Sequence, residues 1–573
     1  MKKVIIKQIV VTLLFVVGLT ITGCSDKFFT LDRPESLPYQ TTNDLDPYVI
    51  SAYSAHFLTG WYAPAGLIPY YSELASDLTF VNMWAIEQEA IYWYPRKMST
   101  YDISGEQCKM TYQALYQALF NCNGPITTIE TREAAGEPVF KGMTDADKAK
   151  LQRQKGELYF MRAYTYWMIS RIFLPPYNNE NNSKRLVPLI TKLEPSQEAM
   201  RNPYLGTVAE IYDLMVSDLE KAKSMLNETS SERGRVNKYV ASAYLMRIYW
   251  LMGNTTKALA ECNTIINEAV GKKYYDLSEE PIRAFNRNQE ATYTINPVAK
   301  EVIWEVVQSA TSNSQPIPLC RMSKAGAYNL NSKAGTFLPS DLNWLGGLRA
   351  TNWSHGGWAC AYWSPRIIKQ IGWASTDNPK DLVNYVPTAE ALKDKRFNQL
   401  HYFLKGNNGD ANADQTVIEK YYPNITWNVF WNDKYWRAPY ARYSNVPLVR
   451  LPEIYLTRAT LSLATNPSQA LADVNLIRQR AGLDPLTSVT ESAIENERIK
   501  ELGFEYSDRL TYLVAMKKTI DGQKPTNENL DKQSRLNDPM NGPFIPAMSY
   551  PYSTMYVPVP DVEYLYSGST IVP

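Results

Sequence analysis

The stretch Gly156-Glu-Leu-Tyr-Phe-Met-Arg-Ala-Tyr164 decides which fold we predict for this chain. It lies in a segment whose apolar or small side chains recur every three or four residues, at Leu158, Met161, Thr165, Met168 and Ile172. That spacing places these side chains on one face of an α-helix. We therefore predict a long helix over residues 152–173, which ends before Pro175-Pro176 because proline disfavours helix continuation.

Helical signals continue after this segment. Thr207 and Glu210 form a capping box that opens a helix reaching Leu226. The next helix ends at Gly253, a typical residue just beyond a helix C-terminus, and Asn254 can cap the one after it. The first part of the chain is thus predicted to be a series of helices joined by short turns.

A second helical block begins near Val449 and runs to Leu463. Asn466-Pro467 then supplies an N-cap and a first helical residue, and that helix stops at Gly482. Ser488 and Glu491 are predicted to cap a last helix. Paired helices with short turns are typical of tetratricopeptide-like hairpins, but no strict period of about 34 residues survives. We therefore predict a mostly α fold built as a degenerate superhelix of such hairpins.

Between the two blocks, residues 275–445 lose helical periodicity and become rich in Asn, Gly, Ser and Pro, and eight of the fourteen tryptophans lie between Trp344 and Trp436. The segment Glu301-Val-Ile-Trp-Glu-Val-Val307 is predicted to be a strand, one of a few short ones. Loops of such length usually carry function. The predicted parts are a helical part over 24–275, a loop-rich subdomain over 276–445 and a helical part over 446–573, with 24–573 forming one compact unit.

The N-terminal residues show the pattern that is typical of an export signal. Basic residues precede an uncharged, largely apolar run from Ile9 to Ile21, and small residues follow it. A transmembrane helix needs about 20 residues, so this run is too short to be one. The stretch Leu19-Thr-Ile-Thr-Gly-Cys24 resembles a bacterial lipobox. We predict that residues 1–23 are a signal peptide and that Cys24 is lipidated; an ordinary signal peptide is the alternative.

Composition excludes some classes of protein. The formal net charge of +1 gives no electrostatic reason to expect nucleic-acid binding. The other five cysteines are scattered without a CxxC motif, so plain burial is predicted for them, although up to two disulfides remain open.

Several motifs, taken in order, resemble those of the SusD/RagB family of surface nutrient-binding lipoproteins. The stretch from Gly156 to Tyr164 resembles the family's GEARFLRAY helix, and the stretch from Val449 to Leu456 resembles its IRLAEVYL helix. Further matches are Asp218-Leu-Glu-Lys-Ala, Gly234-Arg-Val-Asn-Lys-Tyr-Val-Ala241, Val474-Asn-Leu-Ile-Arg-Gln-Arg-Ala-Gly482, Glu497-Arg-Ile-Lys-Glu-Leu502 and Tyr556-Val-Pro-Val-Pro560. One motif departs: the family's FEGxRxxDLRR stands here as Phe504-Glu-Tyr-Ser-Asp-Arg-Leu-Thr-Tyr-Leu513, with its glycine replaced by Tyr506.

The resemblance implies a SusD-like fold, a lipid anchor on the outer membrane facing the cell surface, and a partner. That partner is a SusC-like TonB-dependent barrel, to which the lipoprotein delivers a captured oligosaccharide. A peptide-binding, RagB-like importer component is the alternative. Surface glycoside hydrolase and tetratricopeptide-type adaptor are the two other classes of function that we considered, and neither is preferred.

Exposed aromatic rings with amide groups beside them suit sugars, whose C–H faces are apolar and whose edges carry hydroxyls. The residues in the loop-rich part that fit this description are Trp344, Asn352, Trp353, Trp358 and Trp363. A second set follows Glu73-Leu-Ala-Ser-Asp77, which resembles the family element before a ligand loop: Asn82, Trp84, Trp93 and Tyr94. Trp427, Trp431 and Trp436 are weaker candidates. Core packing is the alternative for each of these residues, whereas Trp167, Trp250 and Trp304 lie in periodic elements and are predicted to be core.

No catalytic residue or cofactor is predicted. Glu497, Glu501 and Glu505 are spaced four apart beside Arg498 and Arg509, which indicates a salt-bridge network between packed helices. The stretch Asp410-Ala-Asn412-Ala-Asp414 begins like a calcium loop, but Gln415 replaces the glycine and Tyr421 replaces the final glutamate, so a solvated turn is preferred. The three histidines are too dispersed to indicate a metal site.

Overall fold

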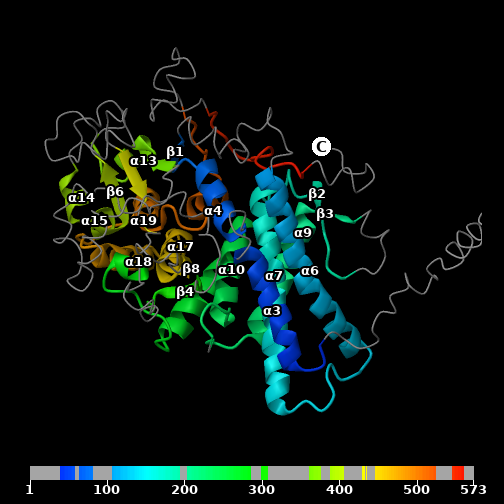
Figure 1. The fold of residues 1–573 in the computed structure, drawn as a ribbon. Helices are drawn as coiled ribbons and strands as arrows, with labels where there is room; N and C mark the ends of the chain where they lie inside the picture. The colour runs from blue at the N-terminus through cyan, green and yellow to red at the C-terminus, as the bar shows by residue number, and fades with distance from the viewer. Residues whose placement is uncertain are drawn as a thin grey trace, which may run out of the picture.

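The computed structural model describes residues 39–57, 64–81, 106–193, 203–230, 232–285, 299–307, 361–375, 387–404, 429–432, 434, 446–523 and 545–560. Four long helices lie side by side on one flank of the molecule: α3 (Thr42–Phe57), α6 (Glu106–Ala134), α7 (Asp145–Ile172) and α9 (Val208–Met225) (Figure 1). Two shorter helices, α4 (Pro64–Ala75) and α10 (Lys238–Leu251), lie between these and the other flank. Among the described residues, none of the helices combines the length and the apolar composition that crossing a bilayer requires.

Helix α7 contains the stretch that decided the predicted fold. It begins seven residues before the predicted start because Thr144 and Asp147 form a capping box, with Thr144 accepting from the Asp147 backbone N–H. It ends at Ile172, just before the proline pair. Gly156 allows α9 to approach closely, since a Cβ there would lie 3.0 Å from the Met225 Cβ. The predicted long helix is therefore confirmed.

The predicted caps between α9 and α11 (Thr255–Thr264) are also confirmed. Thr207 and Glu210 form the capping box of α9, and Asn254 accepts from the Lys257 backbone N–H at the start of α11. Gly253 follows α10 with φ +76°, a conformation that favours glycine. Helix α11 continues into a π-helical turn, η4 (Ile265–Val270), and a 3-10 turn, η5 (Pro281–Ala284), follows it.

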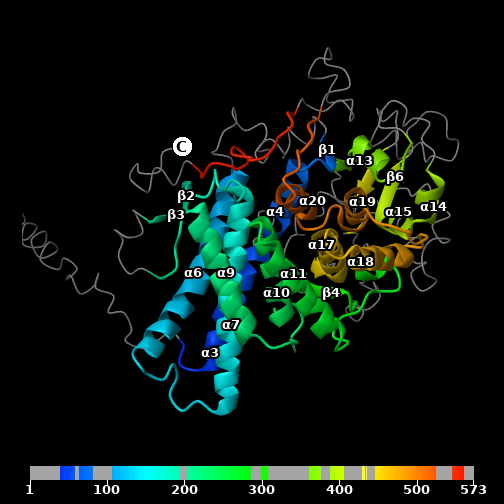
Figure 2. The same cartoon turned by 180° about the vertical axis from the view of Figure 1, so that it is seen from behind.

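The C-terminal block contains α17 (Leu451–Ser462), α18 (Pro467–Arg480), α19 (Glu491–Leu502) and α20 (Asp508–Ala515) (Figure 2). Asn466 caps α18 as predicted. Two predicted boundaries are wrong. Val449 and Arg450 belong to a strand rather than to α17, and Thr490, not Ser488, caps α19 by accepting from the Ala493 N–H.

Within the described ranges, the strands form four two-stranded antiparallel ribbons. The predicted strand is β4 (Val302–Val306), which pairs with β8 (Val446–Arg450). The other ribbons are β1 (Thr79–Val81) with β5 (Ala361–Trp363), β2 (Arg185–Pro188) with β3 (Leu205–Thr207), and β6 (His401–Leu404) with β7 (Val429–Asn432). Three short helices accompany them: α13 (Pro365–Gln370), α14 (Ala389–Lys393) and α15 (Lys395–Leu400). The predicted mostly α fold of helix hairpins with a few short strands is confirmed.

Aromatic rings fill the core where α7, α10 and β4 meet. The ring of Tyr164 lies 5.2 Å from that of Trp304 and 5.5 Å from that of Tyr244, both edge to face. Phe160 contacts the same two rings at 5.3 Å. Edge-to-face pairs of this kind stabilise beyond the area they bury. Trp167, Trp250 and Trp304 are at most 2% exposed, so the prediction that they are core residues is confirmed.

Candidate ligand-binding site

The β1–β5 ribbon brings two of the predicted ligand segments together. Val81 pairs with Ala361 in an antiparallel register, so residue 82 leaves the ribbon at the same end at which residue 360 enters it. Figure 1 shows β1 beside α13, the helix that follows β5. The segments 82–94 and 344–358 therefore attach at one end of one ribbon. Their candidate residues Asn82, Trp84, Trp93, Tyr94, Trp344, Asn352, Trp353 and Trp358 themselves lie outside the described residues.

Of the two preferred sets of ligand candidates, Trp363 is the one residue that the structure describes, and it is buried. Trp431, a weaker candidate, lies in β7 opposite Tyr402. Trp363 is 2% exposed, and its indole Nε1 donates to His401 Nδ1 at 3.1 Å. Its ring packs edge to face against Phe504 at 5.1 Å and Trp373 at 5.5 Å. A buried ring cannot present a stacking face to a sugar. We therefore assign Trp363 to the packing of β5 and leave it out of the proposed ligand surface.

Asp77 fixes the chain just before β1. Arg509 donates to it through Nε at 2.7 Å and Nη2 at 2.8 Å, and Arg366 of α13 donates at 2.8 Å. Burial alone would raise the pKa of Asp77, but the two guanidiniums outweigh burial and hold the pKa below its usual value. Asp77 therefore remains a carboxylate. It attaches the chain before β1, and so before residues 82–94, to α13 and α20.

Lys434 fixes a third segment, just after β7. Its Nζ donates to the carbonyl oxygens of Glu501 and Gly503 at 2.7 and 2.8 Å, and to Glu505 Oε1 at 2.6 Å. The side chain is fully buried. The stretch 427–436 is thus attached to the turn between α19 and α20.

Residues 501–509 cover the end of α19, the turn after it and the start of α20, and they contact Asp77, Trp363 and Lys434, which lie next to the three segments. The turn has an unusual backbone. Phe504, Tyr506 and Ser507 have φ values of 64°, 46° and 67°, in the left-handed region that costs non-glycine residues of the order of 1 kcal/mol each. Tyr506 stands where the family motif has glycine, and its hydroxyl donates to the Ala65 carbonyl at 2.8 Å. Tyr506 therefore adopts a left-handed backbone although it is not glycine, and it adds a contact to α4.

The predicted salt-bridge network of Glu497, Glu501 and Glu505 is confirmed, but its partners differ from those predicted. Arg450 donates to Glu501 at 3.1 Å and twice to Glu505, at 2.7 and 2.8 Å. Glu497 accepts from Arg396 at 2.9 Å. The nearby arginines of the sequence are used elsewhere, because Arg498 pairs with Asp508 and Arg509 pairs with Asp77 and Glu495. Glu505 also lies beyond the end of α19.

These carboxylates serve as counter-charges. Burial alone would raise the pKa of Glu501, but Arg480, Arg450 and Arg396 hold it well below its usual value. A glycosidase acid needs the opposite shift, to a raised pKa, and a second carboxyl across a cleft. Glu501 lies instead inside the packing of α19.

Metal binding finds no support in the part of the chain that the structure describes, where no group of three or more suitable side chains gathers. The weak calcium candidate Asp410, Asn412 and Asp414 lies outside that part. Cys108, Cys122 and Cys262 are buried, as predicted. The buried His56 contacts the Thr165 hydroxyl at 2.8 Å, and burial lowers its pKa to about 3, so it remains neutral.

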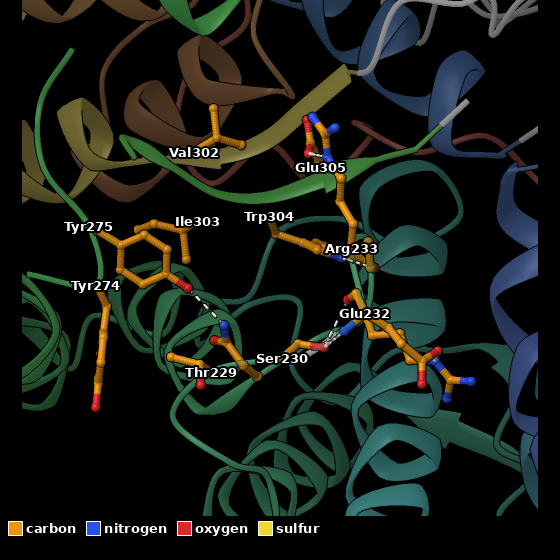
Figure 3. A pocket seen from close by; sticks show the side chains of 13 residues that line it. Thr229, Ser230, Glu232, Arg233, Tyr274, Tyr275, Val302, Ile303, Trp304 and Glu305 are labelled. Atoms are coloured by element: carbon orange, nitrogen blue, oxygen red, sulfur yellow. Dashed lines mark hydrogen bonds and ion pairs between the residues drawn. The ribbon is translucent and has the colours of Figure 1, made fainter. Parts of the chain in front are cut away.

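A cavity that the sequence did not predict lies against β4 (Figure 3). It has a volume of about 250 Å³, and its walls come from the loop between α9 and α10, from the residues after η4 and from β4. The motif that begins at Gly234 lines this cavity, but in the sequence it indicates only the family resemblance. The spacing of residues does not reveal that Tyr274 and Tyr275 pack opposite this motif.

The described residues form stacked helix hairpins with loop segments attached at one end of a ribbon. Two family models match the chain: residues 43–250 match one described as starch-binding and associating with the outer membrane, and residues 300–564 match the SusD family. The chain belongs to the SusD/RagB family.

Known proteins agree with this assignment. A curated relative, SusD-like protein P2 of Formosa agariphila, is 28% identical over 154 residues, which span 26% of this chain and 27% of that protein. A SusD superfamily protein from Bacteroides thetaiotaomicron has a similar structure, with a TM-score of 0.64 and 19% identity over 92% of this chain and 98% of the other. A laminarin-binding SusD-like protein has a TM-score of 0.60 at 17% identity, over 93% and 99%. At these identities the solved structures support the fold alone.

Proposed function

We propose that this chain is a lipid-anchored protein of the outer cell surface that binds an oligosaccharide and delivers it to a SusC-like TonB-dependent barrel. The observation that carries the proposal is the β1–β5 pairing, which joins two tryptophan- and asparagine-containing segments to one end of one ribbon. A sugar chain needs several aromatic faces within a few ångströms of one another. Two segments that leave the same end of one ribbon can supply these aromatic faces.

The ligand class rests on side-chain chemistry and on relatives. Indole rings bind the apolar faces of sugars, and the amides of Asn82 and Asn352 can bind hydroxyls at their edges. One structural relative binds laminarin, and the family model of the N-terminal half is described as starch-binding. A peptide remains the alternative ligand, because the family includes RagB.

The anchor and the partner rest on sequence and family. Acyl chains added to Cys24, the last residue of the lipobox, would hold the protein at a membrane. A tethered binder cannot itself move a ligand across that membrane, so a transporter is required. Cys24→Ala should give a folded protein that no longer fractionates with membranes. Gentle extraction from the native host should recover a TonB-dependent barrel with the wild type, and recovery of the lipoprotein alone would argue against the partnership.

The ligand is tested with a glycan array that includes laminarin and starch oligosaccharides, alongside a peptide library. We expect a glycan to bind, and calorimetry should give about tenfold weaker binding for Trp353→Ala or Trp358→Ala at an unchanged melting temperature. Tyr204→Ala is a suitable control, because this 55% exposed tyrosine precedes β3 on the flank of the long helices. Binding of peptides alone would refute the glycan proposal.

A further inference from the structure

The cavity against β4 has a rigid wall on the side of the α9–α10 loop. The indole Nε1 of Trp304 donates to the Gly234 carbonyl at 2.9 Å, which ties the loop to the strand. Gly234 has φ +85°, and a Cβ there would lie 3.0 Å from Val307 Cγ2. The loop can approach β4 this closely because residue 234 is glycine. The contacts of Gly234 with Trp304 and Val307 therefore fix this wall of the cavity.

The charges of the lining are balanced. Arg233 pairs with Glu305 at 2.5 Å, and Arg235 pairs with Glu232 at 2.8 Å. Each guanidinium thus has a carboxylate, and each carboxylate has a guanidinium. Such a lining favours neither a phosphate, which needs unpaired cations, nor a metal ion, which needs unpaired carboxylates. The ligand that it suits is neutral and polar.

Hydrogen-bonding groups face the cavity from its other wall. Tyr275 accepts from Asn237 Nδ2 at 2.7 Å, and Figure 3 shows its hydroxyl directed across the cavity toward the α9–α10 loop. No acceptor for the proton of this hydroxyl occurs among the described residues. Burial raises the pKa of Tyr275 to about 12, so the proton is retained at neutral pH. Tyr275 can therefore donate to a ligand while Asn237 holds it in place.

Tyr274 adds an aromatic surface beside these groups. The residue is 38% exposed, and its hydroxyl donates to Glu228 Oε2 at 3.1 Å. Lys272 Nζ lies 5.9 Å from the ring centroid. An exposed ring that is held at its far end loses little side-chain entropy when a ligand packs on it. A fixed aromatic face beside a hydroxyl donor is the combination that sugar rings require.

We propose that this cavity binds a single neutral sugar residue, as a second carbohydrate site separate from the segments attached to the β1–β5 ribbon. Its volume of about 250 Å³ accommodates one sugar ring rather than a chain. The inference rests on the proposed function for the class of ligand but not for the position of the site.

Saturation-transfer NMR of the full chain with free D-glucose, D-galactose and D-mannose tests the proposal. We expect at least one of these sugars to receive saturation, and both Tyr275→Phe and Tyr274→Ala to weaken its binding about tenfold. Tyr48→Ala is the matched control, because Tyr48 is also 38% exposed but lies on α3, and it should bind as the wild type does. Should Tyr275→Phe misfold, Tyr274→Ala still decides the question, since its side chain is partly exposed.

The outcomes separate this site from the proposed function. A monosaccharide signal that survives Trp353→Ala and is lost in Tyr274→Ala supports the second site, even if the glycan array shows no oligosaccharide binding. A signal lost in Trp353→Ala and kept in Tyr274→Ala overturns the second site and supports the proposed function. No signal from any of the three sugars, or equal signals from the wild type and both tyrosine variants, also overturns the second site.

Discussion

The two flanks of the molecule are stabilised by different interactions. Where α7, α10 and β4 meet, the core consists of aromatic rings such as Phe160 and Tyr244 in edge-to-face contact. Around α19, buried carboxylates such as Glu501 are matched with buried guanidiniums such as Arg450 and Arg480. Aromatic contacts tolerate changes of shape, whereas a buried charge that loses its partner is strongly destabilising. The segments that carry the candidate ligand residues are fixed to the flank that tolerates change least.

The largest effect is expected for Glu501→Gln. This change removes one fully buried counter-charge that Arg450, Arg480 and Arg396 share, although Glu301 and Asp394 still pair with them, and it should cost about 3–5 kcal/mol of unfolding free energy in denaturant titrations. Asp145→Asn is the control, because its pair with Lys148 is exposed to solvent; it should cost less than about 1 kcal/mol. A cost below about 1 kcal/mol for Glu501→Gln would contradict the distinction between the flanks.

A pH-dependent effect is expected at Glu73, which faces Asp508, Lys434 and Glu505. Burial, followed by repulsion from Asp508, raises its pKa to about 8. The folded chain therefore keeps this proton between about pH 4.5 and pH 8 while the unfolded chain loses it, so stability falls as pH rises through this window.

Glu73→Gln mimics the protonated carboxyl and should remove this loss. Relative to the wild type, the variant should gain roughly 2–3 kcal/mol between pH 6 and pH 8 in denaturant titrations. Phe160→Leu on the aromatic flank should shift the unfolding free energy equally at both pH values. If the wild type and Glu73→Gln show parallel pH profiles, Glu73 is ionised in the folded chain and its assignment as a neutral acid is wrong.

Gly503→Ala should loosen the attachment of β5. A Cβ at this position would lie 2.6 Å from Trp363 Cη2 and 2.7 Å from the Ile499 carbonyl oxygen, so a cost of about 2 kcal/mol is expected. Hydrogen exchange should increase at β5 and β1. Gly124→Ala inside α6 is the control, because its Cβ would meet no atom within 4 Å beyond its chain neighbours and its own helix; since Pro125 follows it, the change should alter stability by less than about 1 kcal/mol. Unchanged exchange at β5 would show that the ribbon is held by other contacts.

The smallest effect is expected for Phe160→Leu on the aromatic flank. Leucine keeps the site apolar and the rings around it can adjust, so the loss should be about 1 kcal/mol. Thermal unfolding measures it. A loss comparable to that of Glu501→Gln would mean that this core is as intolerant as the charged one.

Local signals in the sequence predicted the helices well, because their causes lie within a few residues. The Thr207–Glu210 capping box and the Asn466 cap were confirmed at the residue. Val449 was assigned to a helix because a short apolar run suits either a helix or a strand, and its partner β4 lies far away in the sequence. For the site, the sequence predicted which segments carry candidate ligand residues but not how the fold brings these segments together. The ion pair between Asp77 and Arg509 joins residues 432 positions apart, and no spacing rule reaches that far.

That separation has a consequence for how the chain acquires its structure. Asp77 and Ala65 contact residues 509 and 506, so segments near the two ends of the chain must meet before either set of contacts exists. Contacts between such distant residues are slow to form because loop closure has a large entropic cost. A chain that emerges from its N-terminus onward can complete α7 and α9 early, since these helices neighbour each other in sequence. The contacts that attach the ligand segments to the helices are then among the last to form. Any chain cut short before residue 509 lacks the ion pair with Asp77.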